Sequence, residues 1–101
     1  MTKKFTVALN AATQSQDNQF VTFLKDNDMA WWRYIGNFWL VIDYDDKFHV
    51  ESLRDELLKI YPNVHNFVMD VTGSSSAWAG YGPNSGKNNM FEWLNETWDA
   101  S

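Results

Sequence analysis

AWWRYIGNFWLVIDYDD, residues 30–46, is the stretch that decides the fold of this chain. Two runs rich in aromatic and β-branched residues flank the dipeptide Gly36-Asn37, and such runs around a two-residue break are typical of a β-hairpin. Glycine adopts the positive φ that the turn needs at little cost. Because so apolar a hairpin is not stable in water by itself, we expect the flanking segments to cover it.

The flanking segments have the patterns of two further strands and two helices. Alternating apolar residues predict strands, and apolar residues three and four apart predict amphipathic helices. The strands are expected at residues 4–10 and 64–72, and the helices at residues 13–26 and 50–60. Thr13, with Gln16 three residues later, fits a helix-capping box, and Pro62 ends the second helix.

The last quarter of the chain holds a Gly/Ser-rich loop at residues 73–87 and a helix at residues 88–99. With 101 residues, the chain is expected to form a single domain over residues 1–101. The order of its first six elements is that of the ferredoxin-like βαββαβ fold. We therefore predict an α+β protein with a four-stranded antiparallel sheet, two helices on one face of the sheet and an additional C-terminal helix.

Composition narrows the function classes. Apolar residues make up 45% of the chain and aromatic residues 17%, which excludes a disordered chain. The net charge of −5, without a cluster of Lys and Arg, disfavours nucleic acid as a partner. The chain has no cysteine and no apolar run of membrane-spanning length, so we expect a cytoplasmic protein without disulfides and without a membrane partner.

The sheet face opposite the two helices is the candidate binding face. If Phe38, Leu40 and Ile42 face the helices, alternation places other residues on the opposite face. That face is expected to carry Trp31, Arg33, Trp39, Val41 and Val68, with Thr6 and Ala8 beside them.

Three interpretations of this face stay open. It is covered by the C-terminal helix or by a second copy in a homodimer. It is an aromatic platform for single-stranded nucleic acid. It is a pocket for another protein or a small ligand, with the glycine-rich loop and its aromatic residues Trp78 and Tyr81 as a lid.

The sequence lacks the common catalytic and metal-binding motifs. Asp43, Asp45 and Asp46 resemble the start of a calcium loop, but the glycine and glutamate that should follow are absent. His49 and His65 lack the spacing of metal ligands. We therefore predict no catalytic residue, no metal site and no cofactor.

Three segments resemble those of small ferredoxin-like proteins of the type shared by VapD toxins and the CRISPR adaptation nuclease. They are the strand FTVALN at residues 5–10, the hairpin at residues 32–43 with NFWLVID at its end, and the strand NFVMDV at residues 66–71. The chain is similar to short members of that group whose function is not established. In the nuclease branch an acidic residue at the end of the first strand binds a divalent metal; Asn10 stands there in this chain. The resemblance therefore implies dimerisation through the sheets and argues against metal-dependent cleavage.

The combined expectation is a non-catalytic interaction module that self-associates through its sheet. Such a module is expected to be accessory to a nucleic-acid system or to a toxin–antitoxin-type system. One alternative is a degenerate or divergent metal-dependent nuclease. Another is a small acidic inhibitor protein of a mobile element that binds a host protein, which the acidic residues of the last helix fit.

Overall fold

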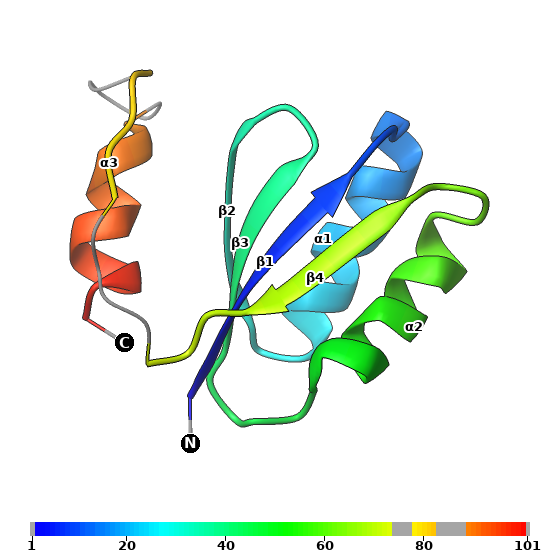
Figure 1. Cartoon of the computed structure of the whole chain (residues 1–101), viewed down its shortest axis with the longest axis horizontal. Coiled ribbons are helices and arrows are strands. Elements are labelled where there is room, and N and C mark those ends of the chain that lie inside the picture. The colour runs from blue at the N-terminus through cyan, green and yellow to red at the C-terminus, as the bar shows by residue number, and fades with distance from the viewer. Residues whose placement is uncertain (1, 74–77, 83–88, 101) are drawn as a thin grey trace.

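The structure, a computed structural model, describes residues 2–73, 78–82 and 89–100. In these residues, four strands and two long helices precede a short C-terminal helix (Figure 1). In chain order the elements are β1 (Lys3–Leu9), α1 (Gln14–Asp26), β2 (Ala30–Ile35), β3 (Phe38–Asp43), α2 (Val50–Ile60), β4 (Asn66–Asp70), α3 (Met90–Trp93) and a π-helical turn, η2 (Leu94–Trp98). We call residues 90–98 the C-terminal helix.

The four strands form one antiparallel sheet in the order β2-β3-β1-β4. Helix α1 joins β1 to β2 and helix α2 joins β3 to β4, so each helix connects two parallel strands that have another strand between them. This is the ferredoxin-like arrangement, and the predicted fold class is confirmed. The predicted loop at residues 73–87 lies largely outside the described residues.

Local sequence signals account for the element boundaries. Gly36, in the two-residue turn of the hairpin, has a φ of +42°. This is the positive φ that the sequence predicts for a glycine at this position. Thr13 and Gln16 form the expected capping box at the start of α1. His49 and Ser52 form a second capping box at the start of α2, with the histidine ring in the role that Ser or Thr usually takes.

The main core lies between the sheet and helices α1 and α2. It contains eleven buried residues: Phe5, Val7, Leu9, Phe20, Leu24, Met29, Trp39, Val41, Leu53, Leu57 and Tyr61. Trp39 is among its largest fully buried side chains, and its ring lies against Phe20 at a centroid distance of 4.7 Å. Burial of these side chains is the largest favourable contribution to folding.

The predicted assignment of the two sheet faces is wrong for β2, β3 and β4. Residues directly opposite each other in an antiparallel pair share a face. Val7 is opposite Trp39 and also opposite Val68, so Trp39 and Val68 point toward the helices with Val7. The sequence could not decide the face of β3, because both of its faces are apolar.

The C-terminal helix lies on the outer face of the sheet, away from α1 and α2 (Figure 1). A second and smaller core lies between this helix and the sheet. Its buried residues are Trp32, Ile42, Met90, Leu94 and Trp98. The C-terminal helix therefore provides cover for this face, as one of the three interpretations expected. Among the described residues, no helix has the length and apolar character needed to cross a membrane.

Candidate functional site

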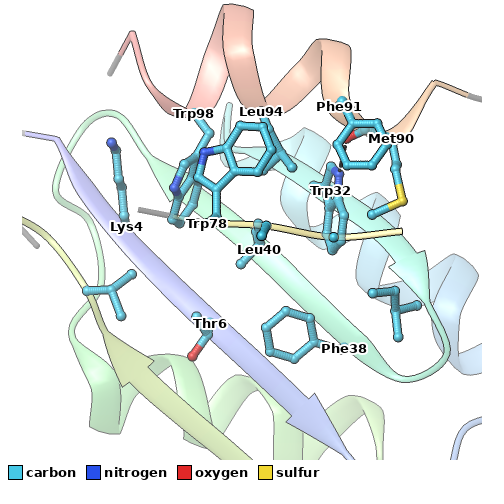
Figure 2. A pocket seen from close by; sticks show the side chains of 14 residues that line it. Lys4, Thr6, Trp32, Phe38, Leu40, Trp78, Met90, Phe91, Leu94 and Trp98 are labelled. Atoms are coloured by element: carbon cyan, nitrogen blue, oxygen red, sulfur yellow. Dashed lines mark hydrogen bonds between the residues drawn. The ribbon is translucent and has the colours of Figure 1, made fainter. Parts of the chain in front are cut away.

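An apolar groove lies between the outer face of the sheet and the C-terminal helix (Figure 2). Its volume is about 360 Å³, within the range of small-molecule sites. The floor is formed by Thr6 of β1 and by Phe38 and Leu40 of β3. The walls come from the C-terminal helix and from residues 78–80.

The wall formed by the C-terminal helix is anchored at both ends. Trp32 Nε1 donates a buried hydrogen bond of 2.8 Å to the backbone oxygen of Met90. Leu94 and Trp98, one and two turns further on, pack into the same cluster of buried side chains. The helix is therefore held against β2 and β3 by one directional contact and by burial.

The part of the wall formed by residues 78–80 is held against the C-terminal helix by Trp78. Its ring stacks on Phe91 at a centroid distance of 6.2 Å, and its Nε1 lies 3.2 and 3.3 Å from the two carboxylate oxygens of Asp99. The chain then passes close to Met90, because a Cβ atom added to Gly82 would overlap the Met90 sulfur. Residues 78–82 are therefore packed along the C-terminal helix. Trp78 was predicted as a loop residue of the site, and it lines the groove; Tyr81 is fully exposed and does not.

A cation stands at one end of the otherwise apolar groove. The Lys4 ammonium lies 5.1 Å from the centroid of the Trp98 ring, and Figure 2 shows both side chains beside Trp78. Among the residues that the structure describes, Lys4 has no salt-bridge partner. Phe38 is paired with Ala8, four residues along β1 from Lys4, which separates the two ends of the floor by about 14 Å.

The outer face continues past the groove onto the edge strand β4. Met69 is opposite Thr6 and Phe67 is opposite Ala8, so both side chains extend the apolar floor beyond β1. They are 47% and 59% exposed, respectively, which is unusual for large apolar side chains on a sheet. The C-terminal helix therefore leaves Phe67 and Met69 of β4 exposed on this face.

The five residues predicted for the binding face are all on one side of the sheet, but it is the side that α1 and α2 cover. Trp39 and Val41 are fully buried there, and Trp31 and Val68 pack against the same core. Arg33 lies at the rim, with its guanidinium 5.1 Å from the Trp39 ring centroid. The prediction that these residues form the uncovered face is therefore corrected.

Arg33 belongs to a polar network at the edge of the main core. Its guanidinium lies 2.9 Å from Asp17 Oδ2, and the Tyr61 hydroxyl donates a buried 2.8 Å hydrogen bond to Asp17 Oδ1. Burial, together with the neighbouring Asp17 carboxylate, raises the pKa of Tyr61 far above its usual value. Because all three side chains are engaged with one another, we assign this network to stabilising the packing of α1 against the sheet and α2.

Apart from Trp78, the sequence prediction for the site does not include the large apolar residues of the groove, among them Trp32, Phe38, Leu40 and Trp98. Trp32 pairs with Leu40, which places both on the outer face. This pairing is the signal that would have identified them, but it depends on the register between strands. Alternation within one strand does not supply it.

Asn10, the position that the family resemblance compares with a metal ligand, has a structural contact. Its side-chain oxygen accepts a 2.9 Å hydrogen bond from the backbone N–H of His65, which ties the end of β1 to the start of β4. Within residues 2–73, 78–82 and 89–100, no three His, Cys, Asp or Glu side chains gather as a metal ion would require.

Comparison of this chain with protein-family models, curated proteins and solved structures finds no match. The resemblance to VapD-type proteins therefore stays a prediction.

Proposed function

We propose that this protein is a non-catalytic binding module whose site is the groove between the outer sheet face and the C-terminal helix. The observation that carries the proposal is a space of about 360 Å³ lined mainly by aromatic and aliphatic side chains. Small-molecule sites have this size and character, with few polar groups. Because this space beside the second core is not filled by side chains, the folded protein lacks the packing contacts that a filled core would make.

A titration of the protein with 1-decanol, followed by two-dimensional NMR, tests this function. Decanol should shift the amide signals of β1, β3 and the C-terminal helix in a saturable manner. Thr6→Phe, which adds a ring to the groove floor, should abolish the shifts. The matched control is Thr22→Phe on the exposed surface of α1, which should leave them intact. Equal binding by both variants would place the ligand elsewhere and contradict the proposal.

Self-association through the sheet is a second candidate function, favoured by the exposure of Phe67 and Met69 on the edge strand β4. A second copy is a suitable partner, because two β4 strands can pair antiparallel about Val68. This pairing sets Asp70 of each strand opposite Asn66 of the other, so the only charged side chain of β4 meets an amide. It would also join the two apolar outer faces across a two-fold axis.

Light scattering after size exclusion tests this candidate. We expect a dimer that Phe67→Lys converts to a monomer, because a lysine at an edge strand opposes pairing. Tyr34→Lys, on the opposite edge strand β2, is the control and should leave the dimer intact. A wild-type monomer at high protein concentration would rule the candidate out.

A further inference from the structure

The groove has one polar end, and its chemistry defines the class of ligand. Two features lie together there, the Lys4 ammonium and the face of the Trp98 ring, and the Thr6 hydroxyl is at the next outer-face position of β1, opposite Leu40. The remaining floor, from Leu40 to Phe38, is apolar. A ligand that lies along this floor meets a cation at one end and apolar side chains at the other.

Lys4 differs from the lysine and arginine side chains of this chain that form salt bridges with acidic residues. Five lysine and arginine side chains are paired with carboxylates: Lys3, Arg33, Lys47, Arg54 and Lys59. Lys4, which is half-buried, has an aromatic face beside it and no carboxylate at salt-bridge distance among the described residues. The Asp99 carboxylate, on the same side of the groove, accepts hydrogen bonds from Trp78 Nε1.

On the basis of the proposed function, we infer that the groove binds an amphipathic anion, with its carboxylate at Lys4 and its apolar body along Leu40 and Phe38. The volume of about 360 Å³ corresponds to roughly twelve groups of the size of a water molecule. Decanoate has about that many non-hydrogen atoms, and its extended chain matches a floor of about 14 Å. A charge-assisted hydrogen bond from the ammonium to the carboxylate fixes which way round the molecule lies.

Isothermal titration of the wild-type protein with decanoate and with 1-decanol tests the inference, because the two probes share the chain and differ in the head group. Lys4→Met should weaken decanoate binding about tenfold, which is about 1.4 kcal/mol, and leave decanol binding nearly unchanged. Lys4→Arg should retain most of the affinity for decanoate. Lys25→Met, at the exposed end of α1, removes the same charge away from the groove and should have no effect on either probe. Far-UV circular dichroism and thermal unfolding of each variant verify that it is folded.

The outcomes separate the two proposals. If decanol binds the wild-type protein and decanoate affinity is the same in Lys4→Met, the groove is a binding site for uncharged apolar molecules and the anion inference is wrong. Equal losses for both probes in Lys4→Met also overturn it, because the lysine would then act through packing. If neither probe binds the wild-type protein, both the proposed function and the inference fail.

Discussion

Trp39 offers the sharpest test of the sheet's orientation, because the two possible faces predict opposite results. On an uncovered face, Trp39→Ala would change binding and leave stability nearly unaffected. In the structure the ring is 1% exposed and packed against Phe20 in the main core. Truncating a buried tryptophan to alanine costs about 3–5 kcal/mol, a large share of the 5–15 kcal/mol that stabilises a typical domain.

Trp39→Phe should behave quite differently. The smaller ring buries roughly 40 Å² less apolar surface, a loss of about 1 kcal/mol. However, Trp39 Nε1 is buried and has no hydrogen-bond partner among the described residues, and such a group costs about 1–3 kcal/mol. Removing it offsets the lost area. We therefore expect Trp39→Phe to stay within about 1 kcal/mol of the wild-type free energy of unfolding.

Urea unfolding followed by far-UV circular dichroism measures both variants without relying on tryptophan fluorescence. With a slope of about 1 kcal/mol per molar urea, Trp39→Ala should lower the midpoint by roughly 3 M or unfold the protein outright. Trp93→Ala, on the partly exposed side of the C-terminal helix, is the control and should cost far less. A Trp39→Ala protein within 1 kcal/mol of wild type, or a Trp39→Phe protein as unstable as the alanine variant, would refute the reasoning.

Three further predictions concern the C-terminal helix and the effect of pH. Trp32→Phe removes the donor to the Met90 backbone oxygen and should speed amide exchange of residues 90–98 about tenfold, with little change at β1; unchanged exchange would show that burial alone holds the helix. Because the pKa of Tyr61 is raised in the folded state, its contribution to stability is present below about pH 10 and is lost as pH rises further. In Tyr61→Phe, urea unfolding between pH 8 and 11 should therefore show a smaller decrease in the free energy of unfolding than in the wild-type protein. The Thr72 hydroxyl and backbone N–H lower the pKa of Asp70, so Asp70→Asn should reduce the loss of stability as pH falls below about 4; an unaltered acid profile would assign that loss to other carboxylates.

The sequence predicted the fold because its signals are local. Gly36-Asn37 identifies the hairpin turn, and Thr13 with Gln16 identifies the start of α1; neither depends on residues far away in the chain. The order of elements then leaves few topologies, of which the ferredoxin-like arrangement is one.

The candidate site could not be predicted in the same way. Trp39 and Leu40 are neighbours in β3 and both are apolar, so their alternation fits either orientation. The pairing of Val7 with Trp39, between strands far apart in the sequence, decides which of the two faces the helices. The groove also requires Trp78 and the C-terminal helix to return to the outer face, and this docking has no local sequence signature.

The unequal size of the two cores has a consequence for how the molecule opens. Eleven buried residues hold α1 and α2 on one face of the sheet, whereas five form the cluster under the C-terminal helix. The free energy needed to lift that helix alone is therefore smaller than the free energy needed to unfold the domain. Such an excursion exposes Leu40 and Phe38 while the rest of the sheet stays intact. Widening of the groove therefore does not require the sheet or helices α1 and α2 to unfold.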